Sequence, residues 1–159
     1  PRRALGLIVH RQQHAAAVGQ GRTGAQLALG KGVAKPDEGD TGGRYFIDPQ
    51  QTATLHVVSY TDAIVGEVTV EEGAHLSPSM RKAAISRWFD PKEQFGNWHQ
   101  LHLGSSKHEV LANLGTPPKG KDTSAWEYPS ACACELPVYF TIYFKNDRIY
   151  KVVFSAPAG

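Results

Sequence analysis

Cysteine and long apolar runs are both scarce in this sequence. The only cysteines are Cys132 and Cys134, and one Cys-x-Cys pair closes too small a ring to act as a disulfide framework. No stretch approaches the roughly 18 consecutive apolar residues that a membrane-spanning helix requires. At 159 residues the chain is long enough to be stabilised by its own core. We expect the two thiols to be small, partly buried side chains, with redox or metal chemistry as the alternative.

A strong charge excess is lacking as well. The 17 Lys and Arg residues and 15 Asp and Glu residues give a net charge of +2, and the basic residues are scattered along the chain. Nucleic-acid-binding domains instead gather basic residues in a patch or stripe, so we expect no nucleic-acid partner. No targeting segment is recognisable, and the start at Pro1 leads us to expect a trimmed or processed form.

Recognisable catalytic motifs are absent too. The chain has no Gly-x-Ser-x-Gly, Walker or His-Glu-x-x-His pattern. Gly19 to Gly24 fits Gly-x-Gly-x-x-Gly, but no strand precedes it and the βαβ context is missing. We interpret His56 and Glu67 as a cross-strand polar pair rather than an acid and base. The sequence therefore predicts a non-enzymatic protein with no catalytic residues, no metal and no cofactor.

Three helices are expected. Ser105 to Leu114 begins with a capping box at Ser106 and Glu109 and ends at Gly115. Pro78 to Phe89 has Ser77 as its N-cap and proline at the first helical position. A weaker helix is predicted within Thr23 to Leu29.

Strand patterns fill most of the remaining chain. Two pairs of strands flank short polar turns, and two shorter strands each lie between a helix and a hairpin. The expected strands are Tyr45 to Ile47, Thr52 to Tyr60, Ile64 to Val70, Trp126 to Tyr128, Val138 to Phe144 and Ile149 to Phe154.

The order helix, strand, hairpin occurs twice. An offset of 85 residues aligns helix-flanking glycines, hairpin turns and returning strands, namely Gly19 with Gly104, Leu29 with Leu114, Gly30 with Gly115, Asp62 with Asp147, Ile64 with Ile149 and Val68 with Val153. Chance agreement is the alternative, because caps and turns obey the same chemistry everywhere. The repeat predicts an α+β fold made of two related helix-plus-antiparallel-sheet units in tandem.

A family resemblance is carried by the second half of the chain. It has Leu101-His102-Leu103-Gly104, the amphipathic helix, Leu114-Gly115-Thr116-Pro117, Trp126-Glu127-Tyr128 and a terminal hairpin. This order resembles the BamE/SmpA-OmlA family over roughly residues 97 to 155, and it implies a helical pair on an antiparallel sheet. Two such units in tandem are similar to the plan of the beta-lactamase inhibitory protein. The first half lacks a proline after Gly30.

The resemblance implies three segments and a mode of action. Residues 1–76 would form a first BamE-like unit, 77–96 a connecting helix and linker, and 97–159 a second BamE-like unit. The implied protein is bacterial, lipoprotein-like and envelope-associated (periplasmic) or secreted. It would bind another protein as an inhibitor, as an immunity-type protein or as an assembly scaffold.

Aromatic residues of the second half are the predicted partner contacts. A two-residue turn at Asn146-Asp147 places Phe144 opposite Ile149 and Phe140 opposite Val153, with Tyr139, Tyr143, Tyr150 and Phe154 together on the other face. Aromatic side chains are enriched at binding hot spots. The candidate partner-binding residues are Trp126, Tyr128, Tyr139, Tyr143 and Tyr150. The alternative is that this face packs against the other half.

Histidine clusters offer a second function. His10 and His14 are four residues apart and could share one face of a helix, and His99 and His102 are three residues apart, near the start of the helix at Ser105 to Leu114. No acidic or thiolate ligand lies at a supporting spacing. The alternative to protein binding is therefore a metal- or small-ligand-binding protein that uses clustered histidines.

Overall fold

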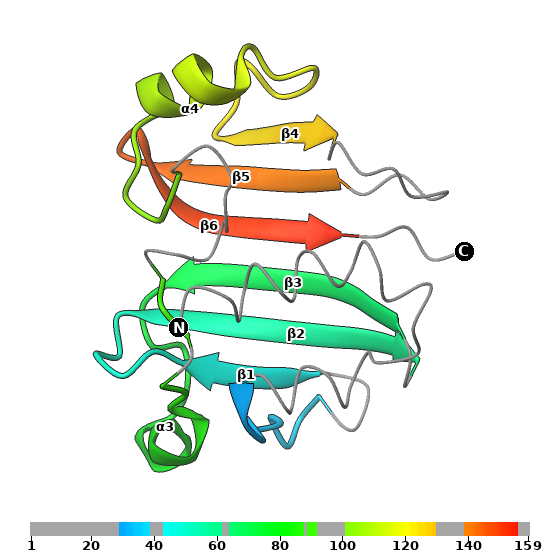
Figure 1. The fold of residues 1–159 in the computed structure, drawn as a ribbon, viewed down its shortest axis with the longest axis vertical. Coiled ribbons are helices and arrows are strands. Elements are labelled where there is room, and N and C mark those ends of the chain that lie inside the picture. The colour runs from blue at the N-terminus through cyan, green and yellow to red at the C-terminus, as the bar shows by residue number, and fades with distance from the viewer. Residues whose placement is uncertain are drawn as a thin grey trace.

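The described residues form a six-stranded antiparallel sheet (Figure 1). The computed structural model describes residues 29–38, 43–61, 64–87, 89–91, 101–129 and 139–155. The strands lie in the order β1-β2-β3-β6-β5-β4. Their bounds are β1 Arg44–Ile47, β2 Ala53–Thr61, β3 Ile64–Glu72, β4 Ala125–Pro129, β5 Tyr139–Lys145 and β6 Arg148–Ser155.

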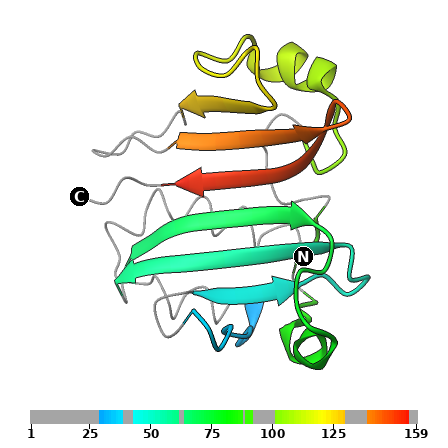
Figure 2. The same cartoon turned by 180° about the vertical axis from the view of Figure 1, so that it is seen from behind.

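The expected division into two helix-plus-sheet units in tandem is wrong. Strands β3 and β6 pair at the centre of the sheet, from Glu67 opposite Ser155 to Glu71 opposite Lys151. Backbone hydrogen bonds therefore join the halves into one sheet, as the view from behind also shows (Figure 2). In the described part of the chain the helices are short, with α3 at Pro78–Ala84 and α4 at Lys107–Leu114. Hydrophobic and turn patterns specify hairpins well, but they do not specify which hairpin edges pair.

The second hairpin has the predicted turn and an unpredicted bulge. Asn146 and Asp147 both have positive φ, at 50° and 58°, as a two-residue turn that follows the strand twist requires. Phe144 pairs with Ile149 as expected, but the register then shifts by one residue. Phe140 consequently pairs with Phe154 rather than Val153, so Phe154 leaves the predicted aromatic face.

Helix α4 forms as its sequence predicts. The Ser106 side chain accepts a hydrogen bond from the Glu109 backbone N–H at 3.1 Å, and Glu109 Oε2 accepts one from the Ser106 N–H at 2.6 Å. This capping box lowers the pKa of the Glu109 carboxyl, chiefly through the backbone hydrogen bond. Gly115 ends the helix with φ of 75°, a conformation that favours glycine.

Helix α3 ends five residues before the expected Phe89. Its C-cap, Ile85, takes extended backbone angles and forms a parallel bridge with Ile47 of β1. The Ser86 backbone N–H donates to the Ile47 carbonyl at 2.8 Å. Pairing with the sheet edge thus replaces the last helical turn. The proposed N-cap residue, Ser77, makes no side-chain capping hydrogen bond.

The two faces of the sheet have separate cores. The face that we call the core face carries the main cluster, which includes Val110 of α4 together with Leu55, Val57, Val68, Val70, Trp126, Tyr128, Phe140, Ile142, Phe144, Val152 and Phe154. The opposite face, which we call the outer face, is covered at the β1 end by α3, where Ala84 and Met80 cluster with Tyr45 and Ile47. Alternating side chains place apolar residues of the central strands on the core face and polar ones outside.

The 85-residue offset does not hold throughout the strands. Val68 is fully buried on the core face, whereas Val153 is partly exposed and pairs with Thr69 on the outer face. The returning strands β3 and β6 both carry a bulge, and the two turns correspond at an offset of 84, since Thr61 pairs with Ile64 and Lys145 with Arg148. Val68 therefore corresponds to Val152, which is buried on the core face, rather than to Val153.

Several sequence-based expectations lie outside the described residues. They are the helix at Thr23 to Leu29 except Leu29 itself, the Gly19 to Gly24 motif, His10, His14, His99 and the two cysteines. No helix in the part of the chain that the structure describes is both long and apolar enough to cross a membrane.

Candidate partner-binding face

Two of the five predicted contacts are core residues. Trp126 and Tyr128 are each only 4% exposed and lie on the core face. The Trp126 ring meets Phe144 edge-on at 4.6 Å, and Tyr128 stacks on Phe140 at 5.3 Å. Tyr128 donates its hydroxyl hydrogen to the Gly115 carbonyl at 2.9 Å, and burial raises its pKa to about 12. Neither side chain is placed to touch a partner of the folded protein.

The other three predicted contacts lie together on the outer face. Tyr139 is 39% exposed, and Tyr143 and Tyr150 are partly exposed. The Tyr143 and Tyr150 rings meet at 6.4 Å in an edge-on arrangement, which the bulge between β5 and β6 permits. We call Tyr139, Tyr143 and Tyr150 the tyrosine stripe.

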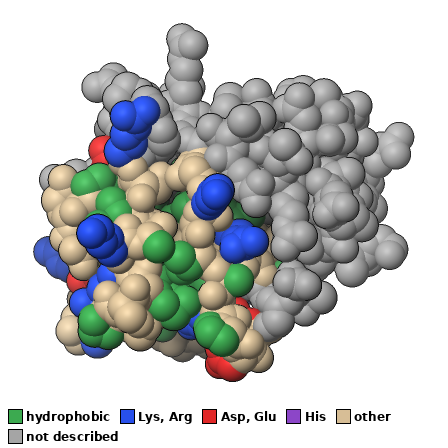
Figure 3. Space-filling model, turned by 90° about the horizontal axis from the view of Figure 1, so that it is seen from below, with side chains coloured by type: hydrophobic (Ala, Val, Ile, Leu, Met, Phe, Trp, Pro, Cys, Tyr) green, Lys and Arg blue, Asp and Glu red, His purple; other side chains and the backbone are tan. Residues whose placement is uncertain are grey.

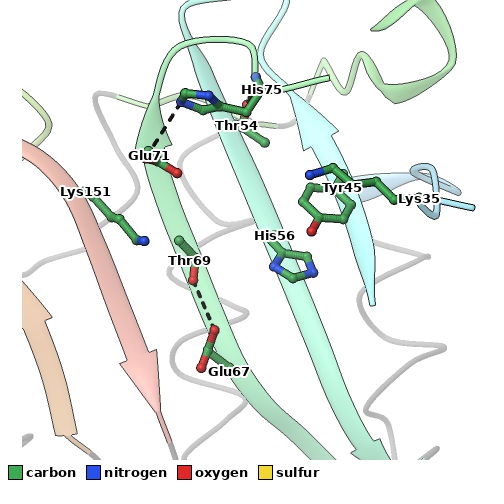
Figure 4. A pocket seen from close by; sticks show the side chains of 9 residues that line it. All are labelled: Lys35, Tyr45, Thr54, His56, Glu67, Thr69, Glu71, His75 and Lys151. Carbon is green, nitrogen blue, oxygen red and sulfur yellow. Dashed lines mark hydrogen bonds and ion pairs between the residues drawn. The ribbon is translucent and has the colours of Figure 1, made fainter. Parts of the chain in front are cut away.

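A hollow lies beside the tyrosine stripe, over strands β1, β2, β3 and β6 (Figure 4). This outer hollow has a volume of about 230 Å³. Its lining is mostly polar and consists of Lys35, Tyr45, Thr54, His56, Glu67, Thr69, Glu71, His75 and Lys151. Thr69 of β3 is one of the smaller lining side chains, and it lies opposite His56 of β2 and Val153 of β6.

One wall of the outer hollow is an ordered aromatic stack. The Tyr45 and His56 rings are nearly parallel, at 6°, with centroids 4.0 Å apart. Lys35 Nζ lies 4.5 Å from the Tyr45 ring centroid. The Tyr45 hydroxyl donates to the Glu38 carboxylate at 2.8 Å, and burial together with this carboxylate raises the tyrosine pKa. Tyr45 is therefore fixed and protonated at neutral pH.

The rim of the outer hollow is also held by specific contacts. Thr54 Oγ1 donates to the Gly73 carbonyl at 2.6 Å and accepts from the His75 backbone N–H at 2.8 Å. His75 Nε2 lies 3.8 Å from Glu71 Oε1. These contacts connect the β2 and β3 strands to the segment after β3 and define the upper end of the hollow.

The predicted pairing of His56 with Glu67 is off by two residues in register. His56 lies opposite Thr69, and Glu67 lies opposite Val58. The Glu67 carboxylate instead accepts a hydrogen bond from Thr69 Oγ1 at 3.3 Å (Figure 4). Both side chains do line the same hollow.

Lys151 joins the hollow to the tyrosine stripe. Its side chain lines the hollow, and its Nζ lies 5.2 Å from the Tyr143 ring centroid. In the register, Lys151 lies between Glu71 of β3 and Tyr143 of β5. The outer face of β3, β6 and β5 thus carries tyrosine, threonine, lysine and glutamate side chains, with Val153 among them.

Sequence reasoning missed several residues of this surface. Period-two alternation along β2 and β3 is enough to place His56, Glu67 and Thr69 on one face. Lys35 and His75 come from segments outside those strands, and no local pattern marks them. Lys151 could not be predicted either, because the register without a bulge places Tyr143 opposite Tyr150, and only the bulge brings Lys151 opposite Tyr143.

Of the four histidines in the predicted pairs, the structure describes only His102. Within the described ranges, no group of three or more His, Cys, Asp or Glu side chains is placed to hold a metal ion. His102, one member of a predicted pair, has its Nδ1 at 2.6 Å from the Leu103 carbonyl.

Comparisons with known proteins add little. No family model matches the chain, and no curated protein sequence matches it. A solved DUF4309 family protein from Bacillus subtilis is similar in structure, with a TM-score of 0.47 and 12% sequence identity over 99% of this chain and 100% of that one. A likeness this weak carries no argument about function.

Proposed function

We propose that this chain is a non-enzymatic protein-binding module that docks a partner protein on its outer face. The observation that carries the proposal is the position of the tyrosine stripe, on the side of the sheet turned away from the main core. Tyrosines give a large contact area at low entropic cost and tolerate both water and burial.

The surroundings of the stripe support the same proposal. Protein interfaces combine aromatic anchors with a polar rim, and Lys151 and the outer hollow supply such a rim. The hollow offers space for one side chain of a partner, because its volume of about 230 Å³ exceeds that of a large residue only modestly.

The edges of the sheet are less suited to binding. Val33 forms an isolated bridge with Tyr45 at the β1 edge, and Lys119 forms one with Glu127 at the β4 edge. Addition of a partner strand requires a free row of backbone groups. Docking on the outer face is therefore favoured over strand addition.

The resemblance to the BamE/SmpA-OmlA family supplies the rest of the proposal. It suggests an envelope-associated or secreted protein that acts as an inhibitor or as an assembly scaffold. An inhibitor would abolish an activity of its partner at equimolar ratio, whereas a scaffold would bring two further proteins into one complex.

Affinity capture from envelope and secreted fractions tests the proposal. The bait proteins are the wild type, the Tyr139→Ala/Tyr143→Ala variant and a Leu111→Ala control. Leu111 on α4 is 40% exposed, which matches Tyr139 at 39%. We expect one partner to be captured by the wild type and the control and lost by the double variant. Capture by all three proteins would show that the stripe is not the docking surface.

A second candidate function is the binding of a small polar ligand in the outer hollow. The observation in its favour is that Lys151, His56 and Glu67, which differ in charge, line one depression. Screening polar metabolites by thermal shift, with Thr69→Tyr to fill the hollow, distinguishes this function. A ligand that stabilises the wild type but not the variant would favour it.

A further inference from the structure

The end of the molecule formed by α3 and the segment at residues 29–36 has a one-sided charge. Residues 29–36 and 73–87 contain Lys31, Lys35, Arg81, Lys82 and Arg87 and no acidic residue. Because the whole chain has a net charge of +2, removing these five charges leaves −3 for the remainder. The other 12 basic residues lie elsewhere in the chain, so these two segments, which end before Asp37 and begin after Glu72, form a local group of five positive charges.

The two segments are in direct contact. The Ser86 hydroxyl donates to the Leu29 carbonyl at 2.6 Å, and both groups are buried. Val33 and Met80 both pack against the small buried cluster that contains Ala84 of α3. The basic side chains that follow these anchors are therefore held on one end of the fold.

Apolar side chains are exposed among these charges. Ile85 is 41% exposed, the largest exposure among the large hydrophobic residues that the structure describes. On the same two segments Lys31, Lys82 and Arg87 are exposed, and Pro78 and Ala83 are exposed as well. Figure 3 views this end and shows hydrophobic side chains between lysine and arginine side chains, with acidic ones at the margin. We call Lys31, Arg81, Lys82, Ile85 and Arg87 the basic end.

We propose that the basic end binds the surface of an anionic phospholipid bilayer. Lysine and arginine side chains attract anionic headgroups, and a short apolar tip can enter the interfacial region. Lys35 contributes less because it lies 3.8 Å from Glu38. Long, flexible lysine and arginine side chains beside exposed apolar ones suit the diffuse negative charge of a membrane surface. They suit less well the fixed carboxylate positions on an acidic protein. This surface lies outside the tyrosine stripe and leaves that stripe available for a partner.

Vesicle sedimentation with the full chain tests the proposal. The probes are phosphatidylcholine vesicles with and without about 30 mol % phosphatidylglycerol, at low salt and at about 0.5 M salt. We expect binding to the anionic vesicles only, and loss of that binding at high salt. No binding to anionic vesicles at low salt would overturn the proposal.

Charge variants locate the site. Lys31→Glu/Lys82→Glu should reduce partition to anionic vesicles at least tenfold, since each basic residue contributes about fivefold. The control, Lys121→Glu/Lys145→Glu, makes the same charge change at exposed lysines of the other half and should reduce it less than about threefold. If both double variants lost vesicle binding equally, binding would depend only on net charge, and the proposal that the basic end is the binding surface would be contradicted.

Two further measurements complete the test. Ile85→Ser should weaken vesicle binding without a change in salt dependence, because it removes only apolar contact. Binding of the wild type to soluble polyglutamate that is as tight as its binding to anionic vesicles would overturn the lipid assignment in favour of an acidic protein. The Tyr139→Ala/Tyr143→Ala variant should bind vesicles normally.

Discussion

The same two strands, β5 and β6, present two very different faces. Their core face carries Phe140, Ile142, Phe144 and Val152, each 5% exposed or less. Their outer face carries the tyrosine stripe, of which Tyr139 is 39% exposed. Both faces are rich in aromatic residues, so composition alone does not separate them. The difference teaches that the register of a hairpin decides whether an aromatic residue stabilises the fold or is available for binding.

The largest expected effect is on the core face. Phe140→Ala should lower the free energy of unfolding by about 3–5 kcal/mol, because Phe140 is fully buried and its loss leaves a cavity. Urea denaturation measures the change. The matched control is Tyr139→Ala at the neighbouring position on the outer face, where the loss should stay below about 1 kcal/mol. Equal losses would contradict the assignment of the two faces.

A smaller effect is expected for the tyrosine on the core face. Tyr128→Phe removes the hydrogen bond to the Gly115 carbonyl and should cost about 1 kcal/mol at neutral pH. Because folding raises the pKa of Tyr128 from 10.0 to about 12, its contribution is fully present below pH 10 and is lost as the pH rises towards 12. Denaturation at several pH values should therefore show a steeper alkaline loss for the wild type than for the variant.

A substitution at the N-terminus of helix α4, which packs on the core face, should lower the free energy of unfolding by a similar or smaller amount. Ser106→Ala removes half of the capping box and should destabilise the protein by about 1 kcal/mol. Because folding lowers the pKa of Glu109, the contribution of its carboxylate is present above pH 4.5 and is lost as the pH falls through the lowered value. Ser106→Asp, which preserves a capping oxygen, is the control and should retain most of the stability in thermal melts.

The smallest effect on stability is expected in the outer hollow. Thr69→Tyr places a large ring over an existing depression and should change the free energy of unfolding by less than about 0.5 kcal/mol. The same substitution should weaken partner binding at least tenfold if a partner side chain enters the hollow. Unchanged binding would restrict the docking surface to the tyrosine stripe.

Local features of the fold were predictable, but their assembly was not. The cap at Ser106, the stop at Gly115 and the turn at Asn146 follow from residue chemistry alone. The central pairing of β3 with β6 joins residues far apart in sequence, and no local pattern specifies it. The predicted helix α3 was too long. The real helix ends at Ile85 because that residue forms a bridge with Ile47 of β1, and the local sequence does not reveal such a tertiary contact.

The candidate binding face was also predicted only in part, because its residues depend on strand register and on tertiary contacts. Period-two alternation correctly grouped Tyr139, Tyr143 and Tyr150, but the bulge moved Phe154 to the core face. Trp126 and Tyr128 had been grouped with the contacts because aromatic type does not reveal which face a short edge strand buries. The wall formed by Lys35 and Tyr45 depends on a loop that packs beside β1.

Hydroxyl-radical footprinting of the chain alone and in complex with its captured partner tests the central claim most directly. Tyrosine is readily oxidised, and each position of the stripe can be quantified by mass spectrometry. The account predicts that oxidation of Tyr139, Tyr143 and Tyr150 falls in the complex, while oxidation of Leu111 on α4 does not change. Unchanged oxidation of the stripe, with protection confined to another part of the surface, would contradict it.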